Sequence, residues 1–363
     1  MKLTRIAQLG AVAAVAALTL TACAANEDGG GAATETGESL SGTLNATGAS
    51  SQDAAQQAWI AAFQTANPNA TVNYQATGSG VGRDNFLAGG QSFIGSDRAF
   101  EVEEIAAGGF GSCASDAIVE VPVYISPVAI IFNLDGVDTL NLKPDVIAQI
   151  FDGKITQWND PAIAADNPDT TLPDTKISPV HRSDPSGTSE TFATYLSAVT
   201  PDAWPYEVSD EWPISSGESA QGTSGVVAAV TSGAGTIGYA DASQAGDLGT
   251  AAVEVDGEYI AYSSEAAAQL VDSSPLAEGR GAGDLVFEVD PSAATDGAYP
   301  IALVSYLIAC EKYDDAAIAE LVKAYFSYVV SAEGQDVAAD AAGSAPISDT
   351  LREKINAAIE LIG

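Results

Sequence analysis

Short apolar runs alternate with helical patterns in the first third of this 363-residue chain. Short strands are predicted at 43–46, at 71–75, where Val72 and Tyr74 alternate with polar residues, and at 92–95. Between the first two strands, apolar side chains such as Trp59 and Phe63 recur at helical spacing. Strands that alternate with helices in this way are typical of an α/β fold with parallel strands.

Small polar residues follow each of these strands. The segments 47–52 and 77–82 consist mainly of Gly, Ser and Thr, and the third strand leads directly to Asp97. The second segment leads into a predicted helix that bears Phe86 and Leu87. Because loops at the carboxyl ends of parallel strands lie side by side, we expect these loops and Asp97 to converge on one crevice.

A further Ser-Gly-Thr turn, at 186–188, follows Arg182. The apolar positions after it have helical spacing: Phe192, Tyr195 and Leu196. A helix is therefore predicted to begin near Ser186, with first-turn amides that lack partners and can hold an oxyanion. Arg182 adds a planar fork of donors that can bind two oxygens of one tetrahedral anion. The alternative is an ordinary turn beside a surface ion pair.

The N-terminus has the layout of an export signal over residues 1–22, with basic residues, a short apolar run and small residues before Cys23. This cysteine context resembles a bacterial lipobox, which implies cleavage before Cys23 and a lipid anchor on its sulfur. A plain signal peptide with an incidental cysteine is the alternative. Residues 23–40 carry almost no large apolar side chains and are expected to form a flexible tether.

The chain is strongly acidic. Without the predicted signal it has 11 basic residues against 49 acidic ones, a net charge of about −38. Nucleic acid is therefore not expected as a partner. An anionic ligand would be repelled by the whole molecule, so its capture would depend on short, directional hydrogen bonds inside a cleft.

Two cysteines remain after Cys23, namely Cys113 and Cys310. An even pair in an exported chain predicts a disulfide, and two buried free thiols are the alternative. The chain has one histidine and no Cys-x-x-Cys motif, so no metal site and no cofactor are predicted.

Several segments together resemble the PstS family, the phosphate-binding proteins of bacterial high-affinity phosphate ABC importers. The matching segments are 150–161 (IFDGKITQWNDP), 179–184 (PVHRSD), 186–188 (SGT), 235–239 (GTIGY) and 299–301 (YPI). The resemblance extends from about Gly42 to the C-terminus. It implies a two-lobed, type II periplasmic-binding-protein clamshell of α/β class, in which each lobe is a mixed sheet flanked by helices.

The resemblance also implies a domain division. The first lobe would hold 41–121 and 311–363, and the second 122–310. The apolar runs 117–134 and 299–309 would be the two crossover strands at the hinge. Further helices are expected at 316–325, on the first lobe, and at 263–272, whose place is left open.

Carried over by position, the phosphate ligands implied by the family fall on eight residues: Ser50, Ser51, Ser79, Asp97, Arg182, Ser186, Gly187 and Thr188. Asp184 would orient Arg182, and His181 would be structural. The chain departs from the family pattern at two places. Ser50-Ser51 stands where Thr-Phe is common, so an aromatic cover is lost, and Pro185 stands where glycine is common, so a backbone donor is lost.

Asp97 would act as a selectivity filter under this resemblance. A hydrogen phosphate ion can donate its proton to the carboxylate, whereas sulfate has no proton to donate at neutral pH and would leave a buried acceptor facing an anion. The alternative is that Asp97 caps a helix or pairs with Arg98.

The resemblance implies a non-enzymatic receptor on the outer face of the bacterial cell membrane, held there by its lipid. It would act as a monomer, bind inorganic phosphate and deliver it to the permease subunits of an ABC importer. The alternatives are the same fold with another oxyanion, such as sulfate, molybdate or a phosphonate; a phosphate-ester hydrolase; and a surface lipoprotein for adhesion or sensing.

Overall fold

The computed structural model describes residues 40–363. The predicted export signal (1–22), the predicted lipid attachment at Cys23 and the tether up to residue 39 lie outside the described residues. Within residues 40–363, no helix is both long enough and apolar enough to cross a membrane.

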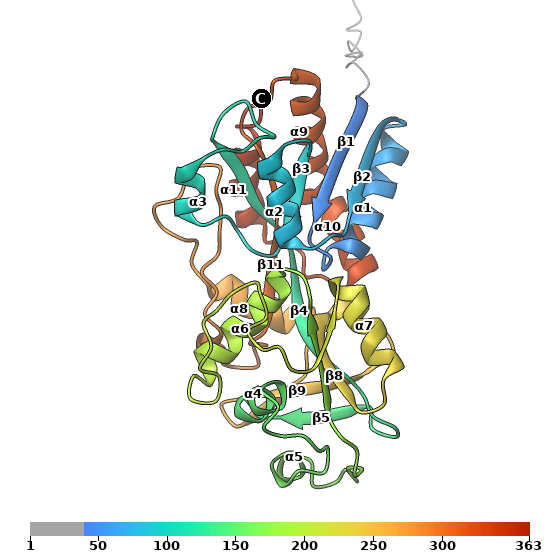
Figure 1. Cartoon of the computed structure of the whole chain (residues 1–363). Helices are drawn as coiled ribbons and strands as arrows, with labels where there is room; N and C mark the ends of the chain where they lie inside the picture. The colour runs from blue at the N-terminus through green and yellow to red at the C-terminus, as the bar shows by residue number, and fades with distance from the viewer. Residues whose placement is uncertain (1–39) are drawn as a thin grey trace, which may run out of the picture. The chain divides into compact units, whose positions relative to one another are not determined.

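A mixed sheet of eleven strands runs through the described residues, with helices packed against it (Figure 1). Eight strands follow the order β2-β1-β3-β11-β4-β8-β6-β7, and β5 and β10 join through β9, which pairs with β4. The strands are β1 (Ser41–Gly48), β2 (Asn69–Gln75), β3 (Phe93–Ser96), β4 (Ile118–Asn133), β5 (Thr139–Leu142), β6 (Ser178–Arg182), β7 (Glu218–Ala220), β8 (Thr236–Asp241), β9 (Gly249–Val255), β10 (Glu258–Ile260) and β11 (Ala302–Cys310).

The helices connect these strands or follow them in the chain, as the alternating pattern of the sequence predicts. They are α1 (Asp53–Ala66), α2 (Ser79–Ala88), α3 (Val102–Ala107), α4 (Pro144–Phe151), α5 (Pro161–Asp166), α6 (Gly187–Val199), α7 (Gly222–Ser232), α8 (Ser264–Ser273), α9 (Ala316–Val330), α10 (Ala332–Ala342) and α11 (Asp349–Ile359), with 3-10 turns at Ala242–Gln244 and Pro291–Ala293. The predicted α/β class is confirmed.

The first three strands are parallel neighbours, with β1 between β2 and β3. Trp59 and Phe63 of α1 are buried against this part of the sheet, as their helical spacing predicted. The predicted helix that bears Phe86 and Leu87 is α2, in which Phe86 is fully buried and Leu87 is 38% exposed. The two are adjacent on the helix, so they point in directions about 100° apart, and only one can face the sheet.

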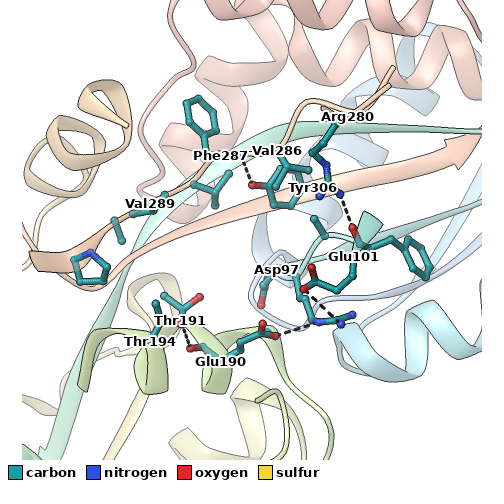
Figure 2. Close-up of a pocket in the computed structure, with 17 residues that line it drawn as sticks. Asp97, Glu101, Glu190, Thr191, Thr194, Arg280, Val286, Phe287, Val289 and Tyr306 are labelled. Atoms are coloured by element: carbon teal, nitrogen blue, oxygen red, sulfur yellow. Dashed lines mark hydrogen bonds and ion pairs between the residues drawn. The ribbon is translucent and has the colours of Figure 1, made fainter. Parts of the chain in front are cut away.

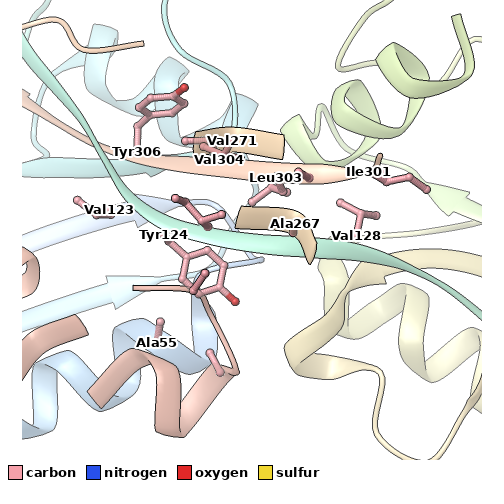
Figure 3. Packing of buried hydrophobic residues seen from close by; sticks show 14 of the residues in the cluster. Ala55, Val123, Tyr124, Val128, Ala267, Val271, Ile301, Leu303, Val304 and Tyr306 are labelled. Atoms are coloured by element: carbon pink, nitrogen blue, oxygen red, sulfur yellow. The ribbon is translucent and has the colours of Figure 1, made fainter. Parts of the chain in front are cut away.

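Strands β4 and β11 pair in antiparallel fashion along most of their length and are buried almost throughout. They carry the sheet from the β1–β3 side to the β8–β6 side (Figure 1). Helix α8 packs on both strands through Ala267 and Val271 (Figure 3), which places the helix predicted at 263–272. The apolar runs of the sequence thus form a continuous buried crossing between two groups of strands.

The second group of strands is β8, β6 and β7, with β6 parallel to both of its neighbours. Helix α6 follows β6 directly and packs on β8, and α7 packs on β8 and β6. Phe192, Tyr195 and Leu196 of α6 are fully buried, as their spacing predicted. The end of β6 and the starts of α6 and α7 therefore lie close together.

The C-terminal helices return to the β1–β3 side, where α9 packs on β1 and α10 on α1. The predicted helix at 316–325 is thus part of a longer helix in the expected surroundings. Cys113 and Cys310 form a disulfide with a Cα–Cα distance of 5.2 Å. The predicted disulfide is confirmed, and it ties the segment after α3 to the end of β11.

Candidate oxyanion-binding site

The loops at the carboxyl ends of β1, β2 and β3 converge on Asp97, as the sequence predicted. The Ser51 hydroxyl, after β1, donates to Asp97 Oδ1 at 2.5 Å. Ser79, at the start of α2 after β2, accepts a hydrogen bond on its hydroxyl oxygen from the Asp97 amide at 3.1 Å. Parallel pairing of the three strands brings these residues together, because it aligns the strand ends at one edge.

The first turn of helix α6 contacts the same aspartate, Asp97. Ser186 is the N-cap and accepts from the Ser189 amide, and the Thr188 hydroxyl donates to Asp97 Oδ2 at 2.9 Å. Gly187 lies so near that an added Cβ would be 2.6 Å from the Asp97 Cβ. A side chain at this position could not be accommodated without separating the two segments.

Arg182 ends β6 and is 4% exposed. Its Nε donates to Asp184 Oδ1 at 2.8 Å and its Nη2 donates to Asp184 Oδ2, so the aspartate grips one edge of the guanidinium. Asp184 also accepts from the Gly222 amide at 3.0 Å. Gly78 packs against the ion pair, because its added Cβ would lie 2.4 Å from Asp184 Oδ2. The loop after β2 thus meets the end of β6.

Ser50 contacts a segment that the sequence analysis did not single out. Its hydroxyl oxygen accepts from the Thr223 amide at 3.0 Å and forms a hydrogen bond with the Thr223 hydroxyl, also at 3.0 Å. Thr223 lies in the first turn of α7, within the sequence Gly-Thr-Ser-Gly at 222–225. This is another turn of Gly, Ser and Thr before a helix. The same pattern that indicated the other loops could therefore have indicated this one.

Ser305 is a second residue that the sequence analysis missed. It lies in the middle of β11, is fully buried, and donates to Asp97 Oδ1 at 2.6 Å. A single serine inside an apolar strand gives no signal of its own. Its contact with Asp97 spans 208 positions along the chain and follows only from the pairing of β11 with β3.

The side chain of Asp97 is thus surrounded by three hydroxyl donors, and Arg98 is not among its partners. Arg98 forms ion pairs with Glu104 at 3.0 Å and with Glu190 of α6 at 3.5 Å. His181 stacks on Trp212 with ring centroids 5.6 Å apart and contacts the Arg182 carbonyl through Nδ1, which agrees with the structural role expected for it. The alternative that Asp97 is a partner of Arg98 therefore does not hold.

Comparison with known proteins gives the family of this chain. Residues 33–333 match the model of a PBP superfamily domain. The chain is 35% identical to phosphate-binding protein PstS 3 of Mycobacterium tuberculosis over 100% of both chains. It is 36% identical to PstS 3 of Mycobacterium leprae, over 88% of this chain and 87% of that protein. The chain belongs to the PstS family.

Solved structures of phosphate-binding proteins share its fold. One is a high affinity periplasmic phosphate-binding protein, PfluDING, solved with phosphate bound; it has a TM-score of 0.71, 21% identity, and coverage of 87% of this chain and 93% of that one. Another is a phosphate binding protein from Stenotrophomonas maltophilia, with a TM-score of 0.64, 21% identity, and coverage of 87% and 94%. At this identity the likeness establishes the type II periplasmic-binding-protein fold and nothing further.

The two departures from the PstS pattern have structural counterparts. The Ser51 hydroxyl, where the family commonly has Phe, binds Asp97 instead of covering the site. Pro185, where glycine is common, accepts a hydrogen bond from the Gly80 amide on its carbonyl at 3.2 Å. Gly80 packs tightly on the proline ring, since an added Cβ would lie 2.4 Å from Pro185 Cβ. The Ser51 hydroxyl and the Pro185 ring therefore add contacts between the loops of the site, whereas the bond to the Pro185 carbonyl would form with glycine as well.

Two ion pairs join the β1–β3 side to the α6 side near the site. Arg83 of α2 contacts Asp210 at 2.5 Å, and Arg98 contacts Glu190. Burial raises the pKa of Glu190 to about 7; Arg98 opposes this increase, and the charge of Asp210 adds to it. Glu190 therefore changes its charge near neutral pH.

A cavity of about 210 Å³ opens beside Asp97 and Gly187 (Figure 2). Glu190 and Thr191 of α6 line one side of it, and Tyr306 and Arg280 line the other. The other predicted ligands do not line this cavity. It therefore reaches the site only along the side of Asp97. Among residues 40–363, no group of three or more His, Cys, Asp or Glu side chains could hold a metal ion.

Proposed function

We propose that this chain is an extracytoplasmic receptor that binds inorganic phosphate and delivers it to the permease of an ABC importer. Membership in the PstS family supports the proposal, because the relatives at 35% identity are phosphate-binding proteins. We further propose that its first lobe (41–121 and 311–363) and its second lobe (122–310) close on the ligand. Cys23 would carry the lipid anchor, and the receptor would act as a monomer.

The proposed ligands are the eight residues that the sequence analysis assigned: Ser50, Ser51, Ser79, Asp97, Arg182, Ser186, Gly187 and Thr188. The observation that carries this assignment is that the ligands come from the two groups of strands on either side of β4 and β11 and meet at Asp97. Thr188 is bonded to Asp97, and Gly187 is packed against it. First-turn amides, one guanidinium and the hydroxyls whose protons are not donated to Asp97 suit a tetrahedral anion; Ser51 and Thr188, whose hydroxyls bind Asp97, would contribute their amides.

The surroundings of Asp97 favour a ligand that carries a proton. An ionised carboxylate has about four lone-pair positions. Ser51 and Ser305 both donate to Oδ1, and Thr188 donates to Oδ2, so one position on Oδ2 remains. A hydrogen phosphate ion can donate to that position, whereas fully deprotonated sulfate would place an anion oxygen against it. Phosphate is therefore favoured over sulfate and molybdate.

A receptor fits the site better than a hydrolase. A hydrolase needs an activated nucleophile or a general base within reach of the phosphate. The only histidine of the chain, His181, stacks on Trp212 and is engaged with a backbone carbonyl. The neighbouring carboxylates are engaged as well: Asp184 with Arg182, Asp97 with three hydroxyls, and Glu190 with Arg98.

Replacement of Arg182 by lysine tests the proposal. Lysine keeps a positive charge beside Asp184 but loses the fork, so the affinity for phosphate should fall about thirty-fold, for a loss on the order of 2 kcal/mol. Calorimetric titration of the wild type and of Arg182→Lys measures this. Arg352→Ala, on α11, is the control and should bind as the wild type does. A wild type that gives no heat with phosphate overturns the proposed function; unchanged affinity in Arg182→Lys removes Arg182 from the site.

A further inference from the structure

A chain of hydrogen bonds leads from Asp97 into the interior of the protein. Ser305 donates to Asp97 Oδ1 at 2.6 Å, and Gln52 Nε2 contacts the Ser305 hydroxyl, also at 2.6 Å. Behind it, Gln56 Nε2 donates to Gln52 Oε1 at 2.8 Å, and the Tyr325 hydroxyl donates to Gln56 Oε1 at 2.8 Å. We call the four residues behind Asp97 the Asp97 hydrogen-bond chain: Ser305, Gln52, Gln56 and Tyr325.

One backbone carbonyl determines the direction of every bond in this chain. The carbonyl of Tyr306 can only accept, and Gln52 contacts it at 3.0 Å, so the atom that faces it must be the amide nitrogen. The second hydrogen of that nitrogen points to Ser305. The Ser305 oxygen therefore accepts from Gln52, and its own proton is left for Asp97.

The directions of the next two bonds, deeper in the interior, follow from that of Gln52. Because the nitrogen of Gln52 faces the carbonyl, its oxygen faces Gln56 and must receive a proton from the Gln56 amide. The oxygen of Gln56 then accepts from Tyr325. Burial raises the pKa of Tyr325 well above its ordinary value, so this hydroxyl keeps its proton and remains a donor. All the bonds point toward Asp97.

The position of these residues makes the arrangement rigid. Each member of the Asp97 hydrogen-bond chain is fully buried. Buried polar side chains that satisfy one another in this way hold a single geometry, because breaking any bond leaves an unpaired buried group.

We propose that the Asp97 hydrogen-bond chain positions Asp97 as an obligate acceptor and thereby determines the preference of the site for oxyanions that carry a proton. Two donors on Oδ1 orient the carboxylate and direct the free position of Oδ2 to the ligand. This inference rests on the proposed function, since it concerns the anion that the site selects. It makes Ser305 and Gln52 specificity-determining residues that need not touch the ligand.

Ser305→Ala tests the inference, with phosphate and sulfate titrated separately at one pH. Loss of a hydrogen bond to a charged group should weaken phosphate binding about ten-fold. Sulfate binding should not weaken, because Asp97 then keeps only Ser51 and Thr188 as side-chain partners and its carboxylate is held less strictly. The ratio of the two affinities should therefore fall about ten-fold or more. Ser305→Thr keeps the donor and should restore the ratio. Ser126→Ala, an equally buried serine on β4 that does not contact Asp97, is the matched control.

The outcomes separate the two proposals. A wild type that does not bind phosphate overturns the proposed function and this inference with it. The inference is wrong if the wild type binds phosphate and Ser305→Ala weakens the binding of both anions equally, or of neither. Ser305 would then have a structural role only. If Ser305→Ala does not fold, Gln52→Met replaces it as the test. That variant removes the donor behind Ser305, and its phosphate-to-sulfate ratio should fall in the same direction.

Discussion

Replacing Gly187 with alanine should weaken phosphate binding without unfolding the protein. Gly187 is in the first turn of α6 and has no positive φ, so alanine suits its backbone. The added methyl group would instead collide with the segment that contains Asp97 and Arg98. An added Cβ would lie 2.6 Å from Asp97 Cβ and 2.8 Å from the Arg98 amide nitrogen, where ordinary contact begins at 3.4 Å.

The size of the effect follows from these distances. Relief of the closest contact needs a shift of 0.8 Å. The same shift would stretch the bond from Thr188 to Asp97 from 2.9 Å to as much as about 3.7 Å, beyond hydrogen-bond range. Loss of one or two hydrogen bonds to charged groups costs about 2–4 kcal/mol. The affinity for phosphate should therefore fall by about thirty-fold to about a thousand-fold.

Calorimetric titration with phosphate measures this loss, and thermal unfolding without ligand shows whether the fold is retained. Gly225→Ala is the matched control, because Gly225 lies near the start of α7 and its added Cβ would have only ordinary contacts at 3.6 Å. It should bind phosphate as the wild type does. Wild-type affinity in Gly187→Ala would refute the reasoning, since it would mean that phosphate binds without the close approach of Gly187 to Asp97.

Two further predictions concern stability. Because the folded state raises the pKa of Glu190 from 4.5 to about 7, it binds the proton more tightly than the unfolded chain does, and the free energy of unfolding should decrease as the pH rises from 4.5 to 7. In Glu190→Gln this decrease in the free energy of unfolding should be smaller by about 3 kcal/mol. Urea unfolding at pH 5 and pH 8 measures it, and an equal decrease in the wild type and the variant would contradict the prediction. Replacing Cys113 and Cys310 with serine opens a loop of 197 residues and should lower the free energy of unfolding by up to about 5 kcal/mol. Thermal unfolding with and without a reductant checks this, and an unchanged midpoint would count against it.

The sequence predicted the parts of the fold that depend on local pattern. Strands near 43–46, 71–75 and 92–95 and a helix from Ser186 all occur, because turn residues and apolar spacing act over a few positions. The long crossing of β4 and β11 follows from two mainly apolar runs. The helix that bears Phe86 and Leu87 also occurs, but the two adjacent apolar positions did not show which one would be buried: Phe86 is, and Leu87 is 38% exposed.

The site was predicted only as far as its loops share one kind of sequence. Ser305 was missed because no local pattern marks it and it reaches the site through a contact 208 positions away along the chain. The turn that contains Thr223 has the same kind of sequence as the other loops and was overlooked. Ser51 was predicted as a phosphate ligand at the position of the family's aromatic residue, and the bond from its hydroxyl to Asp97 was not foreseen. Local sequence identifies which loops contain donors, but sheet pairing decides which donors meet.

The central claim is that Asp97, surrounded by donors, selects an anion that carries a proton. Calorimetric titration of the ligand-free wild type with phosphate and then with sulfate, at neutral pH and equal ionic strength, tests it most directly. The account predicts binding of one phosphate per chain and far weaker binding of sulfate. Sulfate binding as tight as that of phosphate would contradict it, because an acceptor-only Asp97 cannot face a fully deprotonated anion at no cost.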